Sequence, residues 1–173
     1  GVMATVKHFV ANDQEFDRYK VSSEVSERTL HEIYYPPFKA AIQRGGVHAV
    51  MMGYNLVNGV YSAQNKLLMT DMLRNAWGFR GNIMSDWGAT PSTWASVEAG
   101  LDMELGTFDH LNRQQLLPLV ESGKLKESRI DDMVRHILQP CFALGFFDRP
   151  TAKDLSIPTY NEAANRMAYD EAC

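Results

Sequence analysis

The chain has 173 residues, of which 45% are hydrophobic and 22% are charged, and its formal net charge at pH 7 is −4. This size and composition are typical of one globular domain with enough apolar residues for a core. No block of like charge and no apolar stretch of the about 18 residues that span a bilayer is present, so the sequence predicts neither nucleic-acid binding nor a membrane span. Cys141 and Cys173 are too few for a disulfide scaffold.

Short apolar segments recur along the chain and predict strands. They are rich in β-branched residues and methionine, and glycine or polar residues bound them. The first lies at the start of the sequence, so we expect the chain to begin inside a strand. The predicted strands are residues 2–7, 47–52, 82–85 and 101–105.

Amphipathic segments follow these predicted strands and have the apolar spacing of helices. Pro36 and Pro37 are expected to break or kink the first of them, because proline removes a hydrogen-bond donor and clashes with the preceding turn. Asn65 is expected to cap the second, and Thr90 the third, which would start at Pro91. The predicted helices are residues 24–44, 66–76, 91–99, 110–121 and 128–146, and Pro140 interrupts the last.

This alternation of strands and helices predicts an α/β fold with a parallel sheet and right-handed crossovers. Four such units are half of a TIM-type (β/α)8 barrel, which takes about 250 residues in full. Residues 148–160 have the composition of a linker, and residues 161–173 have the pattern of the first turns of another helix.

Asp86 is the most informative polar residue of the sequence. It follows the apolar strand 82–85 and directly precedes Trp87. The C-terminal ends of strands carry the chemistry of (β/α) barrels. A carboxylate there can attack or stabilise an anomeric carbon, and an indole offers a flat apolar face to a sugar ring. The alternative is a helix cap at Asp86, but Thr90 is the better cap candidate.

The other predicted strand ends carry polar residues too, each with a plain structural alternative. Lys7 and His8 end the first strand and suit sugar hydroxyls, although a surface lysine and a structural histidine would look the same. Arg18 lies in the polar loop 12–23, which is either a site loop or a solvated connection. Tyr54 follows the second strand and is either a hydroxyl donor or a residue at the edge of the core.

Asp102 and Glu104 on the fourth strand are either second carboxylates of the site or structural partners of backbone and arginine groups. No metal is predicted, because the histidines show no metal-ligand spacing and no paired cysteine motif accompanies them. No nucleotide cofactor is predicted either, because the glycine-rich phosphate motifs are missing. The scattered histidines are His8, His31, His48, His110 and His136.

Taken together, these motifs resemble the β-glucosidase branch of glycoside hydrolase family 3. The similarity runs in family order along nearly the whole chain, which is far more specific than any one motif. The matching stretches are KHFVANDQE (7–15), SERTLHEIY (26–34), VMMGYN (50–55), NG (58–59), LR (73–74), WGFRG (77–81), MSDW (84–87), AGLDME (99–104) and ALGFFD (143–148).

The resemblance implies a role for each candidate residue. Asp86 matches the catalytic nucleophile of the family, which retains anomeric configuration through a covalent glycosyl-enzyme. The remaining matches belong to the subsite that holds the reacting sugar. They are Lys7, His8 and Arg18 as sugar ligands, Tyr54 beside the nucleophile, and Met51 and Trp87 as pocket walls.

The resemblance also implies what lies outside this chain. Residues 1–147 correspond to the second half of the barrel domain, 148–160 to an interdomain linker, and 161–173 to the first helix of an α/β sandwich domain. The acid/base of the β-glucosidase branch is a glutamate in that later domain, so it is not in this chain. The first half-barrel, which supplies further sugar ligands, is expected elsewhere in the same polypeptide.

The sequence is thus interpreted as part of a retaining β-glycosidase that removes terminal β-D-glucosyl residues from glucosides or oligosaccharides. The alternatives are a β-xylosidase or dual-specificity enzyme, and an incomplete sugar-binding fragment without turnover. An isomerase or aldolase barrel would need a Schiff-base lysine or a phosphate loop, and neither is evident. The family resemblance favours a periplasmic or secreted location.

Overall fold

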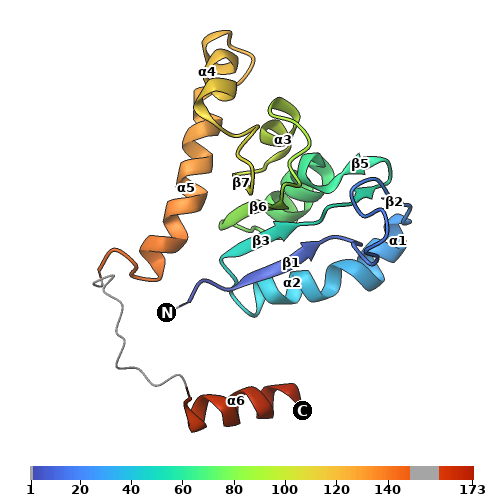
Figure 1. The fold of residues 1–173 in the computed structure, drawn as a ribbon, viewed down its shortest axis with the longest axis vertical. Coiled ribbons are helices and arrows are strands. Elements are labelled where there is room, and N and C mark those ends of the chain that lie inside the picture. The colour runs from blue at the N-terminus through green and yellow to red at the C-terminus, as the bar shows by residue number, and fades with distance from the viewer. Residues whose placement is uncertain (1, 149–159) are drawn as a thin grey trace.

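A four-stranded parallel sheet forms the centre of the fold in the computed structural model, which describes residues 2–148 and 160–173 (Figure 1). The strands lie in the order β1-β3-β6-β7, and each pairs in parallel with its neighbour. Four parallel strands with intervening helices confirm the predicted β-α alternation. The strands are β1 (Thr5–Phe9), β3 (Ala49–Met52), β6 (Asn82–Trp87) and β7 (Met103–Leu105).

The strand ends differ from those expected. β1 begins and ends later than predicted, and β6 continues through Asp86 to Trp87. Lys7, His8, Asp86 and Trp87 therefore belong to the strands themselves, where backbone pairing restricts their positions.

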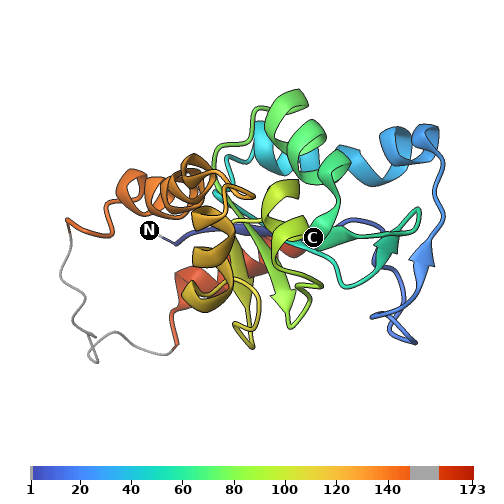
Figure 2. The same ribbon diagram turned by 90° about the horizontal axis from the view of Figure 1, so that it is seen from above.

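Helices α2 and η3 cover one face of the sheet (Figure 2). Alternate strand residues such as Val50 and Ile83 are fully buried against them, because successive side chains of a strand point to opposite faces. Their neighbours Met51, Met84 and Met103 are half-buried on the other face and pair in register across three strands. The helices are α1 (Glu27–Thr29), η1 (Leu30–Tyr34), α2 (Tyr35–Gln43), η2 (Ser62–Gln64), η3 (Leu67–Ala76), α3 (Trp94–Ala99), α4 (Arg113–Glu121), α5 (Glu127–Ala143) and α6 (Glu162–Ala172).

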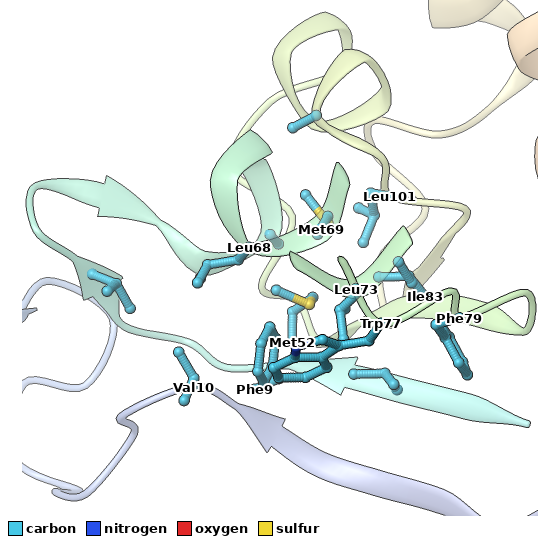
Figure 3. Packing of buried hydrophobic residues seen from close by; sticks show 14 of the residues in the cluster. Phe9, Val10, Met52, Leu68, Met69, Leu73, Trp77, Phe79, Ile83 and Leu101 are labelled. Atoms are coloured by element: carbon cyan, nitrogen blue, oxygen red, sulfur yellow. The ribbon is translucent and has the colours of Figure 1, made fainter. Parts of the chain in front are cut away.

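Aromatic rings fill the centre of this core (Figure 3). Phe9 is fully buried, and its ring centroid lies 5.8 Å from that of Tyr35, 5.0 Å from that of Phe38 and 5.7 Å from that of Trp77. Such pairs add about 0.5–1.5 kcal/mol each to the gain from burial. The strand that carries His8 is therefore fixed to the helical layer by the residue that follows His8.

The helices confirm the predicted segments with three corrections. Pro36 and Pro37 occupy the first turn of α2, where a missing N–H is tolerated, and the irregularity is the π-helical turn η1 before them. The prediction that Thr90 caps a helix starting at Pro91 is wrong, because α3 begins at Trp94. Pro140 does not interrupt α5, which continues to Ala143.

A small second sheet was not predicted. It consists of three two-residue strands in the order β2-β4-β5, which lie in segments predicted to be loops. Its strands are β2 (Ser22–Ser23), β4 (Leu56–Val57) and β5 (Val60–Tyr61).

The last helix, α6, agrees with the expected helical pattern, and Asn161 caps it by accepting a hydrogen bond from the amide of Ala164. Most of the predicted linker falls on residues 149–159, outside the described residues. Within the described part of the chain, every helix is too short or too polar to cross a lipid bilayer.

Candidate active site

The predicted site residues converge at the C-terminal edge of the main sheet. Nε2 of His8 in β1 lies 3.2 Å from Oδ2 of Asp86 in β6, although β3 lies between the two strands. Both side chains are partly exposed, unlike the buried residues on the opposite face. The ends of β1 and β6 thus bring His8 and Asp86 together.

Asp86 also accepts a backbone hydrogen bond, and the protonation of His8 decides whether their contact is an ion pair. Oδ1 of Asp86 accepts a hydrogen bond from the amide of Trp87 at 2.7 Å. Burial lowers the pKa of His8 below its usual 6.5; the Asp86 carboxylate opposes this shift, while Lys7 and Arg18 add to it. A lowered pKa favours the neutral imidazole, so the 3.2 Å contact between His8 and Asp86 is not a full ion pair.

Tyr54 lies buried beside the same carboxylate. Its hydroxyl donates to the carbonyl of Trp87 at 3.0 Å. Burial raises the pKa of Tyr54 well above 10, and a hydrogen bond with Tyr19 and the charge of Asp86 raise it further. Tyr54 therefore remains a protonated donor over the whole physiological range.

Arg18 contacts this cluster through aromatic rings. Its guanidinium carbon lies 4.3 Å from the centroid of the Tyr54 ring, and its Nη1 lies 2.8 Å from Oε2 of Glu15. The ring of Tyr19 packs on Tyr54 with centroids 4.6 Å apart. These contacts place the Arg18 guanidinium where its charge acts on His8. Among the described residues, no hydrogen bond joins Arg18 to Asp86.

The remaining predicted site residues occupy the periphery of the cluster. Lys7 is exposed on β1. Met51 lies on β3 and pairs in register with Met84 of β6. Met84 comes two residues before Asp86. Trp87 is 69% exposed. The structure thus brings His8 into contact with Asp86, and Tyr54 joins them through the carbonyl of Trp87.

A strand irregularity at Asp86 involves Ser85, which the sequence analysis missed. The β6–β7 register shifts between Met84 and Trp87, and the hydroxyl of Ser85 accepts a hydrogen bond from the amide of Leu105 at 3.0 Å. Such irregularities re-aim side chains at the ends of sheets. A lone serine in a strand gives no sequence signal for this role.

Asp102 has a structural environment. It is 2% exposed, and its carboxylate accepts hydrogen bonds from Arg74, Arg129 and the amide of Ile83, with Nδ1 of His136 at 3.0 Å. Burial lowers the pKa of Arg74 to about 10, so this arginine is still charged at neutral pH. The structural alternative is therefore the correct one for Asp102.

Glu104 is bonded to backbone. Its Oε2 accepts hydrogen bonds from the amides of His110 and Leu111, at 3.0 and 2.7 Å. Two carboxylates of the loop 12–23 also have partners, since Asp13 accepts a hydrogen bond from the hydroxyl of Tyr34 and Glu15 pairs with Arg18. In residues 2–148 and 160–173, no cluster of His, Cys, Asp or Glu is suited to hold a metal ion.

A carboxylate held by one imidazole and one backbone amide, with a phenol and a guanidinium beside it, is suited to act as a nucleophile on an electrophilic carbon. Retaining glycoside hydrolysis needs a second carboxyl group about 5–5.5 Å from the first. Among residues 2–148 and 160–173, no described contact joins a second carboxylate to Asp86.

Comparisons with known proteins show the family of this chain. The family model described as the N-terminal domain of glycosyl hydrolase family 3 matches residues 1–139. A β-glucosidase of Rhizobium radiobacter is 44% identical over 156 residues, which are 90% of this chain and 19% of that protein. An exo-α-(1→6)-L-arabinopyranosidase of Bifidobacterium breve is 41% identical over 138 residues, 80% of this chain and 18% of that protein.

Solved structures give the same result. The structure of the β-glucosidase of Bifidobacterium adolescentis matches with a TM-score of 0.84 at 33% identity. The matched region is 97% of this chain and 24% of the β-glucosidase chain. β-Glucosidase 3B of Thermotoga neapolitana in complex with glucose has a TM-score of 0.81 at 34% identity, over 98% of this chain and 24% of its own. The predicted fold class, part of a TIM-type barrel, is confirmed. The chain spans about a fifth of the length of these curated relatives.

Proposed function

The chain belongs to glycosyl hydrolase family 3, and on this premise we propose that it forms part of the active site of a retaining β-glucosidase. The observation that carries the proposal is the contact between Asp86 and His8 at the ends of β6 and β1. Such contacts at the C-terminal edge of a barrel sheet belong to the face on which barrel enzymes act.

In the proposed mechanism Asp86 attacks the anomeric carbon and forms a covalent glycosyl-enzyme. The leaving oxygen takes a proton from a carboxylic acid in another part of the polypeptide, and water then releases the sugar with that carboxylate as the base. The neutral imidazole of His8 and the amide of Trp87 hold the Asp86 carboxylate in place for the attack.

The surrounding residues bind the sugar. Lys7 and Arg18 offer hydrogen-bond donors to its hydroxyl groups, His8 binds a hydroxyl group through its other ring nitrogen, and Met51 and Trp87 form walls of the pocket. The exposed indole of Trp87 supports this role, because a flat apolar ring that is open to solvent can cover one face of a pyranose.

A second candidate function is the hydrolysis of five-carbon pyranosides. It is favoured by the relative of 41% identity that is named an arabinopyranosidase. Arabinopyranose and xylopyranose lack the hydroxymethyl group of glucose, so a site that excludes this group would select them. Relative values of kcat/KM on aryl β-glucosides, β-xylosides and α-L-arabinopyranosides separate these candidates.

The domain boundaries extend this proposal. Residues 1–147 would contribute the second half-barrel, and α6 would begin the next domain after the linker. All residues of α6 are exposed here, which supports a helix whose packing partners are elsewhere. The chain by itself should show no turnover, because it lacks the acid/base and its outer strands have open edges. Robust hydrolysis by the purified chain would contradict this.

The decisive experiment traps the intermediate on the complete protein. A 2-deoxy-2-fluoro glucoside should inactivate it and label the peptide that contains Asp86, as seen by mass spectrometry. Asp86→Ala should abolish turnover, and azide should restore activity with release of the inverted glycosyl azide. Labelling of a different carboxylate would refute the role of Asp86, and failure of glucosides to react while arabinosides do would select the second candidate.

A further inference from the structure

The indole of Trp87 lies against the backbone of Gly106, the first residue of the loop between β7 and α4 (residues 106–112, the β7–α4 loop). An ideal Cβ atom at Gly106 would lie 3.1 Å from Cδ1 and 3.2 Å from Nε1 of Trp87, and 2.8 Å from the amide nitrogen of Gly88. Real Cβ atoms do not approach backbone that closely. Any side chain at position 106 would therefore displace the indole or the strand end.

The backbone of Trp87 is already fixed on several sides. Its amide donates to Asp86, its carbonyl accepts from Tyr54, and the next amide, of Gly88, donates to the carbonyl of Leu105 at 2.8 Å. Only the side-chain torsions of Trp87 remain to be set. Gly106 contacts the pyrrole edge of the ring and so restricts those torsions.

The β7–α4 loop is itself held in place by Glu104. This carboxylate is 2% exposed and binds two loop amides, those of His110 and Leu111. The side-chain amide of Asn112 donates to the carbonyls of Phe108 and Asp109 at 2.8 and 3.2 Å. Hydrogen bonds to a buried carboxylate are among the stronger ones in proteins. The loop is therefore a fixed support.

We propose that Gly106, and Glu104 through the loop, are positioning residues for the Trp87 indole, and that they determine how tightly the site holds the sugar ring. The proposal rests on the proposed function, in which Trp87 is a wall of that site. A displaced indole loses its contact in both the ground state and the transition state, so KM should rise more than kcat falls.

The test compares Gly106→Ala with Gly123→Ala in the complete protein. Both glycines have positive φ, +101° and +72°, but a Cβ at Gly123 meets no atom within 4 Å. The control thus carries the backbone penalty without the contact. Gly106→Ala should raise KM for 4-nitrophenyl β-D-glucoside about tenfold, the equivalent of one aromatic contact, and Gly123→Ala should leave it unchanged.

Acrylamide quenching gives a second readout that does not depend on turnover. The Trp87 signal, obtained by difference from Trp87→Phe, should change its quenching constant in Gly106→Ala and not in Gly123→Ala. If Gly106→Ala fails to fold, Glu104→Gln decides, because a neutral amide binds the two loop amides more weakly and should raise both KM and quenching.

Equal KM values and equal quenching constants in Gly106→Ala and Gly123→Ala would overturn the proposal. If Gly106→Ala does not fold, a folded Glu104→Gln with the KM and the quenching constant of the wild type would overturn it as well. A wild-type protein that cleaves no glycoside would instead overturn the proposed function. Quenching would then still decide whether Gly106 positions the indole.

Discussion

Asp102 is expected to be the most sensitive buried position of this chain to loss of charge. One carboxylate serves Arg74, Arg129, His136 and the amide of Ile83, and it joins β6 and β7 to the helices η3 and α5. Asp102→Asn keeps the shape but removes the negative charge. It also turns an NH2 group toward donors, so at least one of these groups loses its acceptor.

The loss of stability expected for Asp102→Asn follows from the burial of the two arginines. Breaking a buried pair by removing one partner costs about 3–5 kcal/mol, because the other charge stays buried without compensation. Two arginines share this carboxylate, so the free energy of unfolding should fall by at least about 3 kcal/mol. Pulse proteolysis of the complete protein over a urea series measures it as a decrease of about 1 M or more in the midpoint.

Asp132→Asn is the matched control. Asp132 also pairs with an arginine, Arg135, but the two side chains are 49% and 61% exposed. Exposed pairs of this kind contribute about 0–1 kcal/mol, so the midpoint should hardly move. Similar midpoints for Asp102→Asn and Asp132→Asn would refute the view that the buried network stabilises the sheet.

Further predictions concern single contacts. Ser85→Ala should lower the free energy of unfolding by about 1 kcal/mol in urea titrations, because the amide of Leu105 loses its acceptor. An unchanged urea midpoint would show that this hydrogen bond does not stabilise the fold. Gly81→Ala should destabilise by about 3 kcal/mol, since a Cβ there would lie 2.1 Å from the carbonyl oxygen of His48; a soluble variant with the wild-type melting temperature would contradict the contact. Burial lowers the pKa of His8, so below pH 6.5 the unfolded chain binds a proton more readily than the folded one. Stability of the wild type relative to His8→Asn should therefore decrease as pH falls below 6.5, and a pH-independent difference would refute this.

The main sheet and its helices were predictable because short apolar segments alternate with longer amphipathic segments of helical period. The same patterns placed Asp86, His8 and Tyr54 at strand ends, and parallel strands bring such ends to one edge. β2, β4 and β5 were missed because two residues cannot establish a period. Their pairing depends on contacts between distant loops instead.

Other errors came from tertiary contacts that outweigh local preference. Thr90 has the residue type and the following proline of a helix start, yet its side chain is buried and α3 begins later. Arg18 lies over the Tyr54 ring because the polar loop folds back, which no local motif encodes. Ser85 and Gly106 are single small residues whose roles depend on one close neighbour each.

The contact between His8 and Asp86 has a consequence for the order of folding. The two residues come from strands that do not pair with each other, since β3 lies between them. Parallel strands must close long loops before their contacts form, and such non-local pairing is slow. Asp86 therefore meets His8 only after β1, β3 and β6 have assembled, so this contact forms late in folding.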